Sequence, residues 1–123
     1  MNAERLKGHL DMLLLSVLAR GPGHGYEVIT RLRDSSEGAF ELPEGTVYPA
    51  LHRLDGAGLL ASTWEVVNGR RRRIYRVTAA GQEALAQQAG QWRAFSGSIS
   101  RVIGGATVVL PGGSTAIPAW GRT

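Results

Sequence analysis

The pattern of apolar and polar residues between positions 9 and 33 predicts two helices separated by a sharp turn. Residues 9–20 carry apolar side chains around almost the whole helical circumference, which is typical of a helix buried on several sides. The glycine- and proline-rich segment 21–25 then ends this helix. A shorter amphipathic helix follows over residues 26–33, with an apolar stripe formed by Tyr26, Ile29 and Leu32. We expect His24 and Tyr26 to fix the turn, with Tyr26 packed inward.

Residues 42–60 predict a third helix, whose core-facing stripe consists of Val47, Ala50, Leu51 and Leu54. Its start has two candidates, because Pro43 and Pro49 both suit a first helical turn and only one can occupy the first position. A helix that begins at Pro43 has to tolerate Pro49 in its interior, so we expect an irregular first turn. With the apolar stripe facing inward, five side chains remain on the outward side: Thr46, Tyr48, Pro49, His52 and Arg53.

Residues 60–67 and 73–78 are rich in β-branched and aromatic side chains and flank the dipeptide Asn68-Gly69. This dipeptide between two such segments is the strongest short-range signal for a β-hairpin. Thr78 then predicts the N-cap of a fourth helix, although Gly81 stands where a full capping box has Glu or Gln. The tip and return strand of the hairpin are expected to carry four consecutive arginines: Arg70, Arg71, Arg72 and Arg73.

The fourth helix, residues 79–103, has a heptad-like seam. Its members Leu85, Trp92 and Ile99 recur every seven residues, and Ala89, Ser96 and Ile103 lie four residues after each. A helix of this length with an apolar stripe needs a partner surface, which the same helix of a second chain and the over-apolar first helix supply. We therefore expect a homodimer. Residues 104–123 are rich in Gly and Pro and predict a flexible tail.

Charge is distributed unevenly along the chain. Residues 1–69 contain six Lys or Arg against nine Asp or Glu, whereas residues 70–123 contain eight against one. Most of the basic charge lies in the four arginines at 70–73 and in Arg76. Such a cluster attracts a phosphate backbone, because each neutralised phosphate releases counterions.

Composition and motifs exclude several function classes. The chain of 123 residues has the length of one domain and the 43% apolar content of a soluble globular protein. It has no cysteine, and His9, His24 and His52 lack the paired spacing of a metal site. No catalytic triad order or nucleophile motif occurs. We therefore expect no cofactor, no metal and no enzymatic activity. The longest apolar run is too short to cross a bilayer, so we expect no membrane anchor, and the absence of cysteine fits a reducing cytoplasm.

Three helices, a two-stranded hairpin and a trailing helix predict a mainly α fold with a small β-hairpin, namely a winged helix-turn-helix with a C-terminal dimerisation helix. We expect the DNA-binding domain over residues 1–78, the dimerisation helix over 79–103 and the tail over 104–123. In such a fold the third helix enters the major groove and basic residues of the wing hold phosphates. The predicted contacts to double-stranded DNA are therefore Thr46, Tyr48, Pro49, His52 and Arg53 on the helix and Arg70, Arg71, Arg72 and Arg73 on the wing.

A winged helix that serves as a protein-interaction module is the alternative, because one fold supports many functions. Five clustered guanidinium groups argue against this alternative, since they are costly to desolvate at a protein interface unless they are paired.

The chain from Lys7 to about Ile103 resembles the PadR family of bacterial transcriptional regulators. The resemblance rests on three segments: KGHLDMLLLSVLARGPGHGYEV, GTVYPALHRLDGAGLL and GRRRRIYRVTAAG. It implies a dimeric winged-helix repressor whose DNA binding is relieved by phenolic compounds, drugs or other small molecules. With one C-terminal helix, the chain resembles the short branch of the family.

Two interpretations apply to Trp92. It is either a large core residue at the dimer seam, which we prefer, or it flanks a pocket for an aromatic or drug-like effector, as in relatives that hold such effectors near the dimer interface. The residues expected at this seam or pocket are Leu14, Leu85, Ala89, Trp92, Ser96, Ile99 and Ile103.

Overall fold

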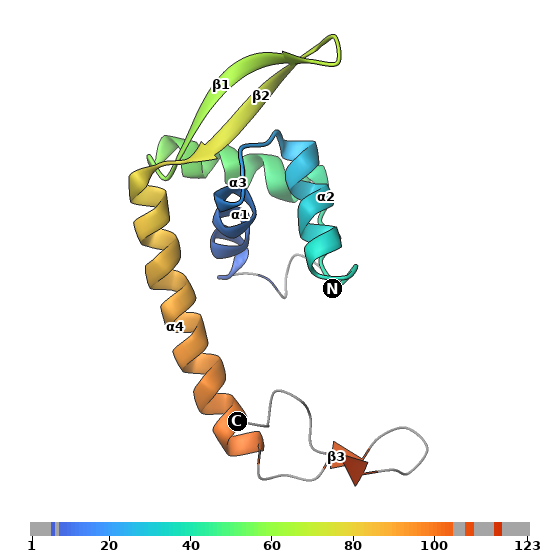
Figure 1. The fold of residues 1–123 in the computed structure, drawn as a ribbon, viewed down its shortest axis with the longest axis vertical. Coiled ribbons are helices and arrows are strands. Elements are labelled where there is room, and N and C mark those ends of the chain that lie inside the picture. The colour runs from blue at the N-terminus through green and yellow to red at the C-terminus, as the bar shows by residue number, and fades with distance from the viewer. Residues whose placement is uncertain (1–5, 7, 105–107, 110–114, 117–123) are drawn as a thin grey trace. The chain divides into compact units, whose positions relative to one another are not determined.

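The computed structural model describes residue 6, residues 8–104, and the pairs 108–109 and 115–116. The helices are α1 (Leu10–Ala19), α2 (Gly25–Ser35), α3 (Glu44–Gly56) and α4 (Ala79–Ile103), and the strands are β1 (Leu60–Val67), β2 (Arg70–Val77), β3 (Val108–Val109) and β4 (Thr115–Ala116) (Figure 1). This order confirms the predicted fold class. The chain divides into two compact units, residues 1–87 and 88–123, and α4 crosses the boundary between them.

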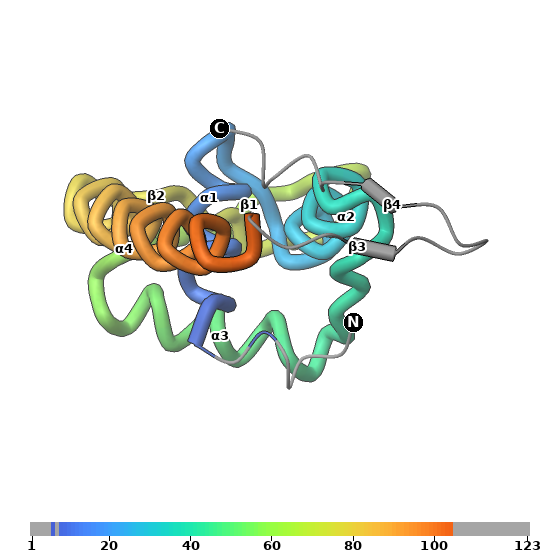
Figure 2. Tube along the Cα trace, turned by 90° about the horizontal axis from the view of Figure 1, so that it is seen from below, coloured from blue at the N-terminus to red at the C-terminus, as the bar shows by residue number. Residues whose placement is uncertain are grey.

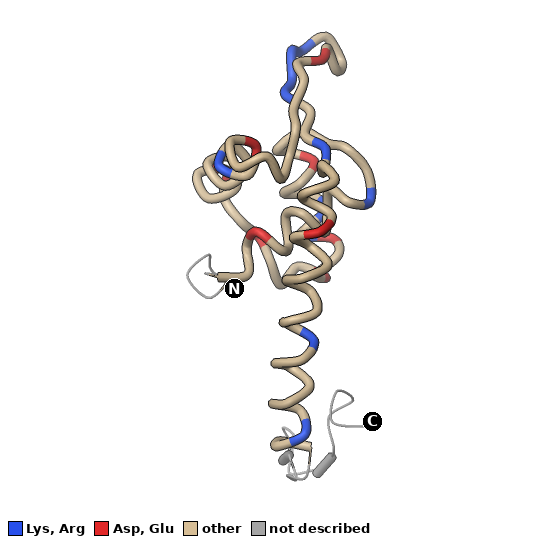
Figure 3. Tube along the Cα trace, turned by 90° about the vertical axis from the view of Figure 1, so that its left-hand side faces the viewer, with Lys and Arg blue, Asp and Glu red and all other residues tan. Residues whose placement is uncertain are grey.

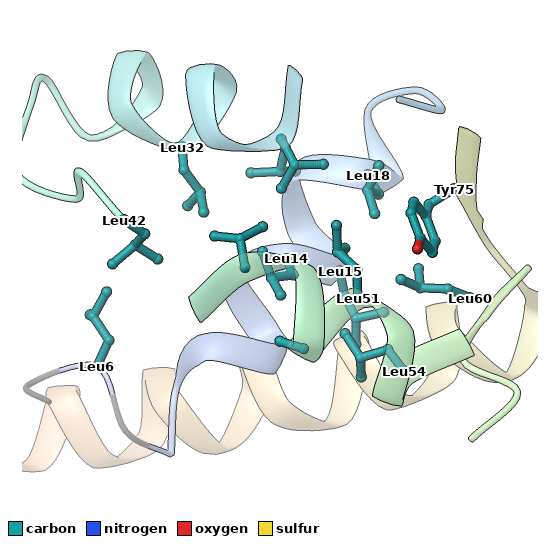
Figure 4. Close-up of a cluster of buried hydrophobic side chains, with 14 residues drawn as sticks. Leu6, Leu14, Leu15, Leu18, Leu32, Leu42, Leu51, Leu54, Leu60 and Tyr75 are labelled. Atoms are coloured by element: carbon teal, nitrogen blue, oxygen red, sulfur yellow. The ribbon is translucent and has the colours of Figure 1, made fainter. Parts of the chain in front are cut away.

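A hydrophobic core joins the first three helices to the hairpin within residues 1–87 (Figure 4). The backbone of these elements is drawn in Figure 2. Helix α1 packs against α2, α3 and β2, which explains why its apolar residues extend around its circumference. The predicted stripe of α3 is buried, and Leu60 and Tyr75 close the core from the hairpin side (Figure 4). The most deeply buried side chains are Leu14, Leu15, Leu51, Leu54, Leu60, Val28 and Val47.

Helix α2 begins one residue earlier than the sequence pattern predicts. Its buried positions are Gly25, Val28 and Leu32. The expectation that Tyr26 packs inward is wrong, because its side chain is 57% exposed. Successive helical residues are about 100° apart, so the residue next to a buried Gly25 turns away from the core.

Helix α3 resolves the ambiguity between its two prolines. Pro43 is the N-cap, Glu44 is the first helical residue, and Pro49 lies inside the helix. The N–H groups of Thr46 and Val47 both donate to the carbonyl of Pro43, at 3.0 and 3.2 Å, so the first turn mixes two hydrogen-bond patterns. This is the irregular first turn that the sequence predicts.

The start of α4 is fixed by Thr78 and Gly81. The Thr78 hydroxyl accepts a hydrogen bond from the Gly81 N–H at 3.0 Å and donates to the Gly58 carbonyl at 2.6 Å, which confirms the predicted cap. A Cβ at position 81 would lie 2.0 Å from the Leu59 carbonyl oxygen and 2.7 Å from Val77. The capping box is therefore incomplete because close packing at this point excludes any side chain.

The second unit contains the C-terminal part of α4 and the antiparallel pair β3–β4. The predicted tail, residues 104–123, lies outside the described residues except for Gly104 and these two short strands.

Candidate nucleic-acid interface

The turn between α1 and α2 is held by a capping box. The Glu27 N–H donates to His24 Nδ1 at 3.3 Å, and the His24 N–H donates to Glu27 Oε1 at 3.2 Å. The expectation that His24 fixes this turn is thereby confirmed. Arg31 adds a second restraint, because its guanidinium donates to the carbonyls of Gly21 and Pro22 at 2.8 and 3.0 Å.

The same turn is joined to the hairpin through Gly23. Its N–H donates to the Tyr75 carbonyl at 3.1 Å, and the Tyr75 N–H donates to the Gly23 carbonyl at 2.9 Å. A Cβ at position 23 would lie 3.0 Å from Arg31 Nη1, so glycine allows this close approach. The start of α2 is consequently fixed against the base of the hairpin.

Helix α3 carries the predicted recognition residues on its outward side. Tyr48, Pro49, His52 and Arg53 are exposed and Thr46 is half-buried. The Tyr48 ring packs directly on Gly25 of α2, where an added Cβ would lie 2.6 Å from two of its ring atoms. The N-terminal ends of α2 and α3 therefore lie against each other.

Arg53 is already engaged within the protein. Its guanidinium makes two hydrogen bonds to the carboxylate of Asp11 on α1, at 3.0 and 2.5 Å. These bonds and the negative charge of Asp11 raise the pKa of Arg53, against a smaller opposing effect of burial. Arg53 thus braces the C-terminal half of α3 against α1, and a contact to DNA would have to share or replace this pair.

The hairpin, residues 60–77, is called the wing below. Its tip is Asn68-Gly69, with φ of 52° and 77°, the left-handed conformation that an Asn-Gly hairpin turn requires. All four consecutive arginines lie in β2, which begins three residues earlier than predicted (Figure 3). The prediction that the tip carries part of the arginine run is therefore wrong. The Asn-Gly turn is followed directly by Arg70, and the pairing of Val67 with Arg70 extends the ladder between β1 and β2 up to this turn.

Because side chains alternate along a strand, the arginine run is divided between the two faces of the wing. Arg71 and Arg73 share a face with Trp64 of β1, which pairs directly with Arg73. Arg70, Arg72 and Arg76 lie on the opposite face. On that face Arg76 lies 3.5 Å from Glu65.

Arg73 ties the wing to α3. Its guanidinium lies 3.2 Å from Asp55 Oδ2 and donates to the Ser62 hydroxyl at 2.8 Å. It also lies 5.7 Å from the centre of the Trp64 ring and 6.0 Å from that of Tyr75. Burial raises the pKa of the Tyr75 hydroxyl, although the charge of Arg73 opposes this shift. Arg73 is therefore a structural residue as well as a predicted DNA contact.

Arg71 is in a different situation. Its guanidinium stacks 5.0 Å from the centre of the Trp64 ring. Among the described residues, no ion pair involves Arg70, Arg71 or Arg72. These three cations are consequently available to an external anion.

A cavity of about 240 Å³ lies where α2, α3 and the wing meet. Its aromatic walls are Tyr48, Trp64 and Tyr75, and His24 and Gly25 line it from α2. The remaining lining residues are Arg71, Arg72 and Arg73. Trp64, which is 55% exposed, was not predicted as a site residue, although its position opposite the arginine run in an Asn-Gly hairpin could have indicated it.

The second unit presents apolar side chains on α4. Trp92, Phe95, Ile99 and Val102 are exposed and follow a heptad spacing. The rings of Trp92 and Phe95 are 6.2 Å apart and inclined by 48°. The predicted seam omitted Phe95 and Val102, which the same spacing rule would have found three residues after Trp92 and Ile99.

Other members of the predicted seam or pocket are placed differently. Leu14 has no exposed surface, so it cannot line a pocket open to a ligand, and this prediction does not fit the structure. It is buried because α1 packs against three elements of its own chain. Leu85 is partly buried against that same core. Ala89, Ser96 and Ile103 are half-buried on α4.

The described residues include neither a metal-binding cluster nor a membrane-spanning helix. No group of three His, Cys, Asp or Glu side chains there could hold a metal ion. No helix in that part of the chain has the length and hydropathy needed to cross a membrane.

Three helices, an arginine-bearing antiparallel wing and a long C-terminal helix define the winged helix-turn-helix class of transcriptional regulators. Residues 14–87 match the family described as "Transcriptional regulator PadR-like family". The match covers more than half of the chain, and the chain therefore belongs to the PadR-like family of transcriptional regulators.

Individual relatives agree with this assignment. A transcriptional regulator of Mycobacterium tuberculosis is 42% identical over 73 residues, which cover 59% of this chain and 65% of the relative. The transcriptional regulator YqjI of Escherichia coli is 29% identical over 85 residues, which cover 69% of this chain but 36% of YqjI. The chain thus spans less than two thirds of the length of either relative.

Solved structures share the fold. A transcriptional regulator from Clostridium thermocellum superposes with a TM-score of 0.74 at 27% identity, covering 82% of this chain and 99% of that one. A PadR family transcriptional regulator from Eggerthella lenta superposes with a TM-score of 0.70 at 33% identity, covering 81% and 86%.

Proposed function

We propose that this protein is a cytoplasmic, homodimeric repressor that binds specific double-stranded DNA and is released by a small-molecule effector. The observation that carries the DNA-binding part is that Tyr48 of α3 and Arg71 of the wing line one cavity. The outward side of α3 and one basic face of the wing therefore form a continuous surface. A protein needs such a surface to contact base edges in a DNA groove together with the adjacent phosphate backbone.

Helix α3 and the wing have separate roles in the proposed contact with DNA. Thr46, Tyr48, Pro49 and His52 on α3 meet base edges in the major groove, where each base pair presents its own hydrogen-bonding pattern. Arg70, Arg71 and Arg72 contact phosphates, because no ion pair of the described residues occupies them. Arg53 and Arg73 reach DNA only by sharing the carboxylates of Asp11 and Asp55, so their contribution is smaller.

The homodimer forms through α4. Four exposed apolar side chains at heptad spacing favour burial against the same helix of a second copy. Two recognition helices then address two half-sites about one helical turn, roughly 34 Å, apart.

An effector pocket at this seam involves Ala89, Trp92, Ser96, Ile99 and Ile103. Its occupant changes the spacing of the two recognition helices and so lowers DNA affinity. Titrating phenolics and planar drugs against tryptophan fluorescence tests this pocket, with Trp92→Phe as the matched variant. A quench that is equal in both proteins would contradict a pocket at Trp92.

The proposed function as a whole is tested by a mobility shift on the DNA upstream of the gene and its neighbours, at two salt concentrations, against a random duplex of equal length. We expect a shift of the upstream DNA that persists in excess random duplex and weakens with salt. Absence of binding to both duplexes at low salt would overturn the proposal and favour a protein-interaction module.

A further inference from the structure

We propose that the cavity between the wing, α2 and α3 binds a small planar aromatic anion, and that this ligand competes directly with DNA. The cavity lies entirely within residues 24–75 and uses no residue of α4. It is therefore a second ligand site in addition to the one proposed at the dimer seam. The competition part rests on the proposed function, whereas ligand binding itself does not.

The charge of the cavity selects an anion. Three arginines line it, and no Asp or Glu belongs to its described lining. Arg73 is already neutralised by Asp55 at 3.2 Å. Arg71 takes part in no ion pair of the described residues, and one of its neighbours in the cavity is an apolar indole. A guanidinium beside an aromatic ring is poorly hydrated, so a carboxylate or sulfonate that pairs with it gains more than at an open surface.

The walls of the cavity select a flat aromatic body. Tyr48 and Tyr75 lie on the two sides that α3 and the wing supply, and Trp64 contributes an indole whose surface is more than half exposed. Aromatic rings stack on one another and on guanidinium planes, and both kinds of partner line this cavity. An aliphatic anion would use the charge but leave these rings solvated.

The volume limits the size of the ligand. Typical ligand pockets have volumes of about 300–1,000 Å³, so a cavity of about 240 Å³ accommodates one or two fused rings with a single acidic group. Gly25 maintains this space, because any side chain there would displace the Tyr48 ring.

Such a ligand would contact side chains that also contact DNA in the proposed function. Tyr48 and Arg71 are proposed DNA contacts and also line the cavity. Ligand and DNA phosphate cannot pair with one guanidinium in the same geometry, so each lowers the apparent affinity for the other. This control requires no change in the distance between the two recognition helices.

Nuclear magnetic resonance of the indole N–H groups tests ligand binding without DNA. The chain has three tryptophans, Trp64, Trp92 and Trp120, and Trp64→Phe assigns the signal of interest. We expect 2-naphthoate to shift the Trp64 signal and to bind about tenfold more tightly than neutral 2-naphthalenemethanol. Arg71→Gln should weaken 2-naphthoate binding by about tenfold, whereas Arg70→Gln on the opposite face of the wing should change it less than about twofold.

Three outcomes would overturn the ligand site. They are the absence of any shift at millimolar 2-naphthoate, shifts confined to the Trp92 or Trp120 signals, and equal binding of the charged and neutral compounds.

The competition is tested by titrating 2-naphthoate into the complex of the protein with a fluorescent duplex at constant ionic strength, with sodium acetate as the matched salt. Release of the duplex by 2-naphthoate but not by acetate supports the competition. If the protein binds no DNA, the proposed function fails while the Trp64 shift still reports on the cavity.

Discussion

The guanidinium of Arg73 on the wing lies 3.2 Å from the carboxylate of Asp55 on α3. Both side chains are partly exposed, and the Ser62 hydroxyl connects them, donating to Asp55 at 2.5 Å and accepting from Arg73 at 2.8 Å. This network connects the wing to α3. Arg73, the last of the four consecutive arginines, is therefore structural, whereas Arg71, two residues earlier on the same face of the wing, takes part in no ion pair of the described residues.

Replacing Arg73 with Gln should lower the free energy of unfolding by about 1 kcal/mol, because Asp55 loses its cation in a partly solvated site. For a domain of this size the melting temperature should fall by roughly 4–8 °C. Thermal unfolding followed by circular dichroism measures the change. Arg70→Gln is the matched control and should stay within about 0.5 kcal/mol of the unmodified protein. Equal stability of both variants would refute the structural role of Arg73.

Replacing Arg71 with Ala should weaken binding to operator and random DNA by the same factor. It should also reduce the slope of log Kd against log salt by about one, the contribution of one phosphate contact. Fluorescence anisotropy at four salt concentrations measures both quantities. A loss of affinity for the operator alone would mean that Arg71 reads a base.

Variants of the α3 surface should change the sequence preference of DNA binding, unlike the Arg71 variant. Thr46→Ala and His52→Ala should relax the preference at particular base pairs, with a change of about 1–3 kcal/mol at each contacted position. Selection of bound duplexes from a pool with single base changes measures the preference. If both variants lose affinity uniformly, α3 contributes phosphate contacts and its recognition role is rejected.

Gly81→Ala should destabilise the protein by about 3 kcal/mol or more, because the new methyl group would overlap the Leu59 carbonyl oxygen, a backbone atom of the segment between α3 and β1 that cannot move aside as a side chain can. Gly90→Ala on the same helix provides the control. Nothing lies within 4 Å of its added Cβ, and alanine in a helix interior is favoured over glycine by about 1 kcal/mol. Urea unfolding should therefore move in opposite directions for the two variants, and a neutral Gly81→Ala would contradict the close packing at the start of α4.

Phe95→Glu should convert a dimer to a monomer, because it places a charge within the apolar stripe of α4. Sedimentation velocity over a range of protein concentrations measures the mass. Arg93→Glu is the control, since it reverses a charge on the same helix at an exposed position outside the stripe. A Phe95→Glu protein that sediments as the unmodified one does would exclude this stripe as the dimer interface.

Local signals in the sequence determined most of the elements. The Asn-Gly turn, the glycines after α1 and the stripe of α3 each act over a few residues, and the structure confirms all three. The limits of α2 and β2 were less certain, because a pattern marks the middle of an element better than its ends. Tyr26 was misplaced for another reason: the predicted stripe was placed on Tyr26 and Ile29, whereas the buried positions at this end of the helix are Gly25 and Val28.

The sequence by itself determined that this chain is a winged helix with a concentration of arginines on its wing. Only the tertiary structure decided which arginines are available. Asp11 lies 42 positions from Arg53, and Asp55 lies 18 from Arg73, so no local pattern could reveal that these carboxylates already pair with them. The same applies to the cavity, because its walls come from three elements that meet only when the core forms. Periodicity shows which way a side chain faces, whereas the group that it meets depends on the packing of distant segments.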